Sequence, residues 1–351
     1  MQHHYFAASN SSDGFKSYYG EVFERADRIY IIKGGPGTGK SSFMKKCSAE
    51  SERRGKGVEY YYCSSDPSSL DGILIFGEGE TIGIVDGTAP HVWEPTYPGA
   101  KEEIINLGEF WHSKALREQK NEIFALSNKK SAAFKRAYSY LRSCGNLRVV
   151  SDALLRKATD FDKLQGAAQR LARSLEIDEG NFRSIPSLTT AVSMTGIVKL
   201  DTFEQNSKRL WRIGEFYGVG QWFIDALIGS LQKYQANARV SYNCIDPRYC
   251  DGIFLEKEAF GFVIGKHGNG DCEDGEDERF INPKRFVRTE KMREIRGELR
   301  YASRLYSDCL DGALHALSEA KVYHFLLEDI YKHAMDFAAL DEFSREFSKS
   351  L

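Results

Sequence analysis

The stretch IIKGGPGTGKSSF, Ile31 to Phe43, decides the fold expected for this chain. It contains the pattern G-x-x-x-x-G-K-[ST], which is typical of a loop that wraps the phosphates of a nucleotide. Polyphosphate must lie against bare backbone N–H groups, so such a loop needs residues without a Cβ atom. The sequence therefore predicts that a nucleotide is held by Gly34, Gly35, Pro36, Gly37, Thr38, Gly39, Lys40, Ser41 and Ser42.

The residues on both sides of this loop agree with that prediction. RIYIIK before the loop is rich in β-branched and aromatic residues and predicts a buried strand. SSFMKKCSAESERR after it predicts an amphipathic helix, which points its N-terminus at the anion. In this arrangement Lys40 supplies a cation for the outer phosphates, and the Ser41 hydroxyl can bind Mg²⁺.

A second acidic ligand is expected at the end of a later strand. TIGIVDGTAPH, Thr81 to His91, is a hydrophobic run that ends in Asp86. An acid at the tip of a buried strand, downstream of a phosphate loop, is where a Mg²⁺-organising carboxylate belongs. We therefore predict a magnesium site formed by Ser41 and Asp86.

Other candidate residues follow the neighbouring strands. Asp66, at the end of the strand VEYYYCSS, could act as a base or orient a water molecule, and His91 could contact the γ-phosphate. Asp66-Pro67 and Asp71-Gly72 are also turn-forming pairs, so turn chemistry is the competing explanation for these acids. The predicted catalytic set is Lys40, Asp86, Asp66 and His91.

The composition is that of an ordinary globular protein. The chain has 351 residues, 42% hydrophobic and 28% charged, with a formal net charge of −2. No run of 18 apolar residues predicts a membrane span, and the N-terminus lacks the features of a secretory signal. The seven cysteines are odd in number and show no C-x-x-C spacing, which indicates reduced thiols and a cytoplasmic protein.

A second stretch, RIGEFYGVGQWF, resembles the phosphate loop without its chemistry. Gly218 and Gly220 match Gly37 and Gly39, but Gln221 replaces Lys40 and Trp222 replaces Ser41. DPSSLDGI and DPRYCDGI match at a similar offset, and GIVDG matches GFVIG, so that Ile264 replaces Asp86. Ordered matches at nearly one offset indicate an internal duplication in which the second copy is degenerate.

We therefore expect an α/β fold made of two tandem phosphate-loop domains, each with a mostly parallel sheet and its own long helical hairpin. The first domain would span residues 1–182, with a helical extension at about 101–180. The second would span residues 183–351, with an extension at about 284–350, and residues 183–190 would link the two.

The motifs HYFAASNSSDGF, KGGPGTGKSSFMKK, CSSDPSSLDG and VDGTAPH resemble the P-loop NTPases, and in particular a bacterial family of tandem P-loop proteins described as ATPases or nucleotide-kinase-like proteins. The resemblance covers nearly the whole chain and implies ATP binding from Gly34 to Ser41. In that family the second phosphate loop is often recognisable, whereas this chain departs from it at Gln221, Trp222 and Ile264.

Three functions remain open at this point. The first is an ATPase that uses ATP and Mg²⁺, and the second is a kinase for an unknown small molecule or nucleotide, with Asp66 or Asp71 as base. The third is a nucleotide-dependent switch linked to a protein or a nucleic acid. It is suggested by 14 Lys and Arg against five Asp and Glu between Lys114 and Arg173, although a solvated helical face explains the same excess.

Overall fold

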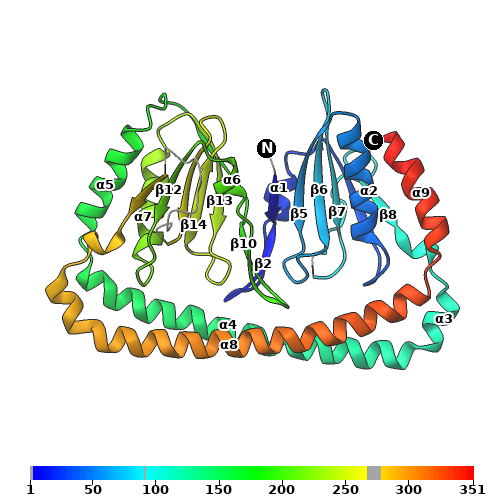
Figure 1. Ribbon diagram of the computed structural model, residues 1–351. Helices are drawn as coiled ribbons and strands as arrows, with labels where there is room; N and C mark the ends of the chain where they lie inside the picture. The colour runs from blue at the N-terminus through cyan, green and yellow to red at the C-terminus, as the bar shows by residue number, and fades with distance from the viewer. Residues whose placement is uncertain (1–2, 91, 267–277) are drawn as a thin grey trace.

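The structure is a computed structural model that describes residues 3–90, 92–266 and 278–351. Two six-stranded sheets stand side by side, and a pair of long helices runs beneath both of them (Figure 1). The chain is therefore an α/β protein with two similar halves, in agreement with the prediction from the sequence.

The first half contains, in chain order, β1 (His4–Phe6), β2 (Ala8–Ser11), β3 (Gly14–Ser17), α1 (Tyr19–Phe23), β4 (Arg28–Lys33), α2 (Lys40–Arg53), β5 (Gly57–Tyr62), β6 (Leu70–Phe76), β7 (Thr81–Asp86), β8 (Glu102–Asn106), the short 3-10 helix η1 (Leu107–Phe110), α3 (Ser113–Glu118), α4 (Lys120–Ala158) and α5 (Phe161–Arg173).

The second half repeats this order, except that the single helix α8 takes the place of α3 and α4. Its elements are β9 (Phe182–Pro186), β10 (Thr190–Ser193), β11 (Gly196–Lys199), α6 (Thr202–Asn206), β12 (Arg209–Ile213), α7 (Val219–Leu231), β13 (Ala236–Tyr242), β14 (Cys250–Leu255), β15 (Phe260–Ile264), β16 (Glu278–Ile281), η2 (Pro283–Phe286), α8 (Thr289–His333) and α9 (Phe337–Ser350).

The two sheets have the same strand order. The first is β1-β5-β6-β7-β4-β8, and the second, taken in the same direction, is β9-β13-β14-β15-β12-β16. In each sheet the third strand of this order is antiparallel to its neighbours, and the other five run parallel. The sheets are therefore mostly parallel, and their matched topology is compatible with an internal repeat.

The registers identify corresponding residues in the two halves. Ile32 pairs with Asp86 in the first sheet and Ile213 with Ile264 in the second, so Asp86 corresponds to Ile264. In the helical part, Asp160 caps α5 and Asp336 caps α9 by accepting from backbone amides in the same way. Corresponding residues can therefore be compared across both halves.

The helices at the end of each half cross over to the other half. Helices α4 and α8 run antiparallel along each other beneath both sheets, α5 packs on α7 of the second half, and α9 packs on α2 of the first (Figure 1). Backbone hydrogen bonds hold each crossing. The Asp160 amide donates to the Phe286 carbonyl at 2.8 Å, and the Asp336 amide donates to the Phe110 carbonyl at 2.7 Å. Each sheet is thus covered on one side by a helix from the other half.

The expectation that each half keeps its own helical hairpin is therefore wrong. Helix α4 extends below both sheets instead of folding back over its own sheet. Small side chains let it approach α8 closely, since Ala137 and Leu141 share a core with Ala313, Ala316 and Leu317. Burial of this shared apolar surface stabilises the exchanged arrangement.

Two segments also differ from the expected secondary structure. Residues 183–190 are not a free linker, because most of β9 lies within them and pairs in parallel with β13. The first helical extension does not begin near residue 101, because β8 pairs with β4 at the edge of the first sheet and buries Ile105. In both places strand pairing provides backbone hydrogen bonds that local periodicity does not predict.

A buried ion pair joins the two halves between their facing sheet edges. Glu59 of β5 and Arg239 of β13 are corresponding residues, and both are almost fully buried. Their side chains approach to 2.5 Å, and Arg25 approaches the other oxygen of Glu59 to the same distance. Burial by itself would raise the pKa of Glu59, but Arg239 and Arg25 outweigh it and lower the pKa to about 2.

We predict that Arg239→Met lowers the free energy of unfolding by about 3–5 kcal/mol, because it leaves a buried carboxylate with one cation fewer. Chemical denaturation followed by circular dichroism measures this loss. The double variant Glu59→Gln with Arg239→Met is the control, and it should recover a large part of the loss.

The difference between the parent and Arg239→Met should also shrink in acid. The parent pair contributes stability above the ordinary Glu pKa of 4.5, and this contribution is lost as the pH falls toward about 2. A constant difference from neutral pH down to this range would contradict the role given to Glu59.

Candidate functional site

The predicted phosphate loop lies between β4 and α2, at the carboxyl end of β4, which stands between β7 and the edge strand β8. Gly37 and Gly39 have φ angles of 71° and 87°, in the left-handed region that favours glycine. Gly39 is also the N-cap of α2, so the helix begins at Lys40. The sequence GGPGTGK thus produces a tight loop that leads directly into a helix N-terminus, which is the geometry that suits an anion.

Lys40 is held at the centre of this loop. Its Nζ donates to the carbonyl oxygens of Gly34 at 3.0 Å and Gly35 at 2.7 Å. The same Nζ lies 3.5 Å from Oδ2 of Asp86. The structure therefore brings together Lys40 and Asp86, which are 46 positions apart in the sequence.

Ser41 and Asp86 supply the oxygen atoms that Mg²⁺ prefers. Ser41 Oγ accepts a hydrogen bond from the Leu70 amide at 2.9 Å, and Asp86 accepts one from the Thr88 amide at 2.8 Å and another from the Thr88 hydroxyl. The pKa of Asp86 is raised. Burial is the main cause and the nearby Asp71 adds to it, while the positive charge of Lys40 offsets only part of the increase. Among the described residues no three His, Cys, Asp or Glu side chains form a ready-made metal cluster, so a metal here would also need phosphate or water ligands.

The remaining predicted residues are placed less directly. Asp66 accepts hydrogen bonds from the hydroxyls of Ser68 at 2.8 Å and Ser69 at 2.7 Å, which is the turn chemistry weighed against catalysis. Ser42 is exposed on α2. His91 lies outside the described residues. Asp71 is buried and lies close enough to Asp86 to raise the pKa of that carboxyl.

The sequence did not predict that the second half would pack against this loop. A Cβ atom on Gly37 would meet the Glu328 carbonyl oxygen at 2.6 Å, and one on Gly35 would meet the Tyr331 ring at 2.7 Å. Both contacts come from α8. Glu328 also approaches His324 of the same helix, with 3.5 Å between the carboxylate and Nε2. The loop glycines are therefore needed for close packing as well as for backbone conformation.

Lys130 of α4 is a further cation at this site. Burial lowers its pKa, the charge of Lys40 lowers it further, and Glu328 raises it. In the second half the corresponding position on α8 is Tyr306, so only the first site has this additional cation. The signal was present in the basic excess of this region, but a sequence pattern cannot tell which of many lysines faces the loop.

The degenerate loop of the second half is filled by its own side chains. The Glu215 carboxylate accepts from the Gly218 amide at 2.9 Å, in the manner of a bound anion. The guanidinium of Arg148, from α4, lies directly against Gly218 and pairs with Asp152 at 3.0 Å. A carboxylate and a guanidinium of the chain thus occupy the loop and its surroundings.

The replaced residues of the second half serve packing. Gln221 is buried and donates to Asp251 at 3.1 Å. Trp222 is buried against the Phe161 ring, with 5.2 Å between ring centroids, and the Arg156 guanidinium covers its face. Ile264 takes the place of Asp86. The second half therefore has neither a cation at the position of Lys40 nor oxygen-bearing side chains capable of the predicted metal binding at the positions of Ser41 and Asp86.

Comparison with known proteins adds no assignment, because no family model, no curated protein and no solved structure matches the chain. No helix in the described part of the chain combines the length and the apolar character needed to cross a bilayer.

We predict that Gly37→Ala lowers the free energy of unfolding by about 2 kcal/mol more than Gly55→Ala does. Gly55 has a φ of 79° but nothing within 4 Å of an added Cβ, so it measures backbone strain alone. Gly37→Ala adds the clash with α8, which must shift. Equal losses in denaturant titrations of the two variants would contradict the close packing of α8 on the loop.

Proposed function

We propose that this protein is a P-loop ATPase with one active site, formed by the loop of the first half and completed by helices α4 and α8. The observation that carries the proposal is the convergence of Lys40, Ser41 and Asp86 at a glycine loop that caps a helix. The loss of all three groups from an otherwise matched second half supports it, because there the same fold stands without the same chemistry.

In the proposed mechanism the loop amides and Lys40 bind the β- and γ-phosphates of ATP. Ser41 and Asp86 would hold Mg²⁺, directly or through water, and the ion would offset charge on the phosphates. Water attacks the γ-phosphorus in line, the bond to the β,γ-bridging oxygen breaks, and ADP and inorganic phosphate are released. We assign the orientation of that water to Asp71, because it is buried and lies close enough to Asp86 to raise the pKa of that carboxyl.

Lys130 would supply positive charge from outside the loop. A cation brought to the transferring phosphoryl group by another element can stabilise the negative charge that develops there. Helix α4 holds Lys130 near Lys40, and the buried environment disfavours the charged form until an anion is present. Phosphate binding would therefore favour protonated Lys130.

Lys40→Ala should abolish detectable ATP turnover, because it removes the cation at the phosphates. Gln221→Ala, at the corresponding position of the second half, should leave turnover per folded molecule nearly unchanged. The turnover of both variants is measured as the release of phosphate and ADP. Gln221→Ala also loses the Gln221–Asp251 hydrogen bond, so a denaturant titration gives the folded fraction by which its turnover is corrected. Full activity in Lys40→Ala would refute the site.

The same assay separates an ATPase from a kinase. Steady release of phosphate without an added acceptor supports hydrolysis. ADP release that requires a nucleotide or small-molecule acceptor, with phosphate found on that acceptor, would assign a kinase to the same site.

Lys130→Met should lower kcat by about a hundredfold, as expected for loss of one charged group that stabilises the transition state. Lys129→Met is the matched control, because the neighbouring Lys129 is exposed and its Nζ lies over the Tyr323 ring. As the pH is raised, kcat/KM of the parent should fall when Lys130 loses its proton. Because the pKa of Lys130 is lowered, this alkaline fall should begin at a lower pH than the pKa of an ordinary lysine.

Lys130→Arg should retain activity and lose this alkaline fall, because a guanidinium stays protonated. If Lys130→Met and Lys129→Met behave alike, Lys130 has no part in the reaction.

A further inference from the structure

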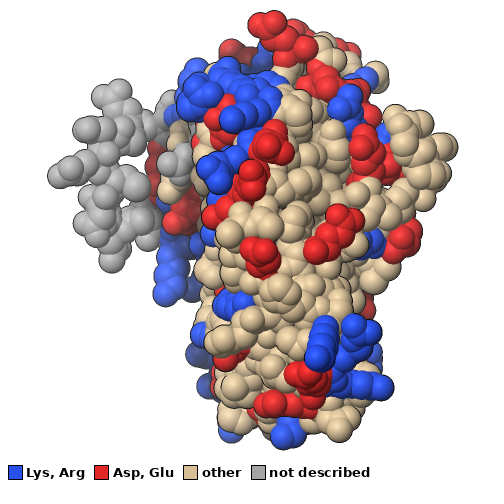
Figure 2. All heavy atoms as spheres, turned by 90° about the vertical axis from the view of Figure 1, so that its right-hand side faces the viewer, with Lys and Arg blue, Asp and Glu red and all other residues tan. Residues whose placement is uncertain are grey.

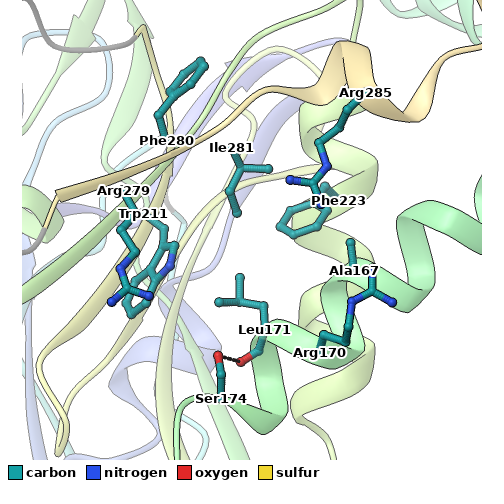
Figure 3. A pocket seen from close by; sticks show the side chains of 10 residues that line it. All are labelled: Ala167, Arg170, Leu171, Ser174, Trp211, Phe223, Arg279, Phe280, Ile281 and Arg285. Carbon is teal, nitrogen blue, oxygen red and sulfur yellow. Dashed lines mark hydrogen bonds between the residues drawn. The ribbon is translucent and has the colours of Figure 1, made fainter.

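A cavity of about 390 Å³ opens on the outer side of the second half, far along the chain from the phosphate loop (Figure 3). Its walls come from α5, which crosses over from the first half, and from β12, α7, β16 and η2. Figure 3 shows Arg279 on one side of the cavity and Arg170 and Arg285 on the other. Between them lie apolar side chains, including Trp211, Phe223 and Leu171.

At the corresponding place in the first half, larger side chains line the groove. Ala167 and Leu171 of α5 correspond to Phe343 and Phe347 of α9. The Phe343 ring stacks on Phe43 at a centroid distance of 5.9 Å, and the Phe347 ring lies against Tyr30 at 4.9 Å. The two larger rings fill the groove of the first half, whereas Ala167 and Leu171 leave it open in the second.

The charges around the groove are also inverted between the halves. The register pairs Tyr30 with Glu103 and Trp211 with Arg279, so these two charged residues correspond. Likewise Arg285 corresponds to Glu109, and Arg170 to Glu346. Figure 2, which looks at the molecule from the side of α9, shows acidic side chains spread among basic ones on that face. Three acids of the first half are thus three arginines in the second.

These arginines are available to an outside anion. All three are exposed, and no ion pair in the described part of the chain joins any of them to a carboxylate. Arg279 lies over the Trp211 ring at 5.8 Å and Arg285 over the Phe286 ring at 5.0 Å, which places each guanidinium beside an apolar surface. Guanidinium groups are the side chains best suited to bidentate binding of phosphate.

We propose that this cavity binds a nucleotide, with its phosphate on the arginines and its base against the apolar wall. The volume lies in the range of small-molecule sites. An inorganic anion would use the arginines alone, whereas a nucleotide also uses the apolar wall and the exposed Phe280 ring at the rim. The nucleotide could be free or part of a single strand, since both offer the same phosphate and base.

The test uses the full chain with Lys40→Ala, so that binding at the phosphate loop does not contribute. AMP and UMP are titrated by calorimetry, and a fluorescein-labelled oligo(U) 12-mer by anisotropy. Saturable binding of at least one probe is expected. No binding of any of them at millimolar concentration overturns the proposal.

Further substitutions, each made in the chain that carries Lys40→Ala, test whether binding occurs in this cavity. Arg285→Glu and Arg170→Glu each introduce the acidic residue found at the corresponding position of the first half. Each should weaken binding about tenfold. Ala167→Phe fills the cavity as Phe343 does and should weaken binding at least as much while keeping all three arginines. Arg173→Glu, an exposed change on the same helix outside the cavity, should have little effect.

The pattern of results decides the proposal. If Arg173→Glu weakens binding as much as Arg285→Glu and Ala167→Phe has no effect, the binding is diffuse and the proposed site is refuted. Should Ala167→Phe fail to fold, the two exposed arginine variants still test the site. Tighter binding of oligo(U) with a steep salt dependence identifies a single strand as the source, and equal binding of AMP or UMP identifies a free nucleotide.

Discussion

The exchange of terminal helices between the two halves is the constraint on which the rest of the structure depends. Helix α2 begins at the phosphate loop, and the helix that covers α2 is α9, which follows more than 280 residues after that loop. The contacts of Glu328 and Tyr331 with the loop glycines follow from the same crossing. The first half therefore cannot close its own site, because the second half supplies the covering layer.

The central interface shows why two unlike halves can pack more firmly than two identical copies. Glu59 and Arg239 hold corresponding positions in the two sheets, so two identical halves packed in this way would bring like charges together. A chain with two unlike halves can instead place Glu59 opposite Arg239 and bury both with their charges paired. Burial of a charge is tolerated where another charge and hydrogen bonds compensate it, as they do here.

The two halves share one strand topology and differ in the position of their cations. The first retains Lys40 and Lys130 at the phosphate loop, where the second has Gln221 and Tyr306 and fills the loop with Glu215 and Arg148. On the outer face the second half carries the cations, because three arginines line its cavity where the first half has acidic residues. The cations that distinguish the two halves thus lie at the loop in the first half and on the outer face in the second.

The sequence alone determined the elements whose causes are local. The glycine pattern from Gly34 to Gly39 requires a tight loop, and the apolar run before Asp86 predicts a buried strand that ends in an acid, so both were predictable. The matches at Gly218 and Gly220 also predicted two similar halves, and the two sheets have the same strand order. Tertiary structure alone decided that α9 covers the first half, that Lys130 lies near Lys40, and that Asp66 accepts hydrogen bonds within its own turn. These depend on contacts between residues far apart in the chain, and amphipathic periodicity shows that a helix has an apolar face without showing which surface will cover it.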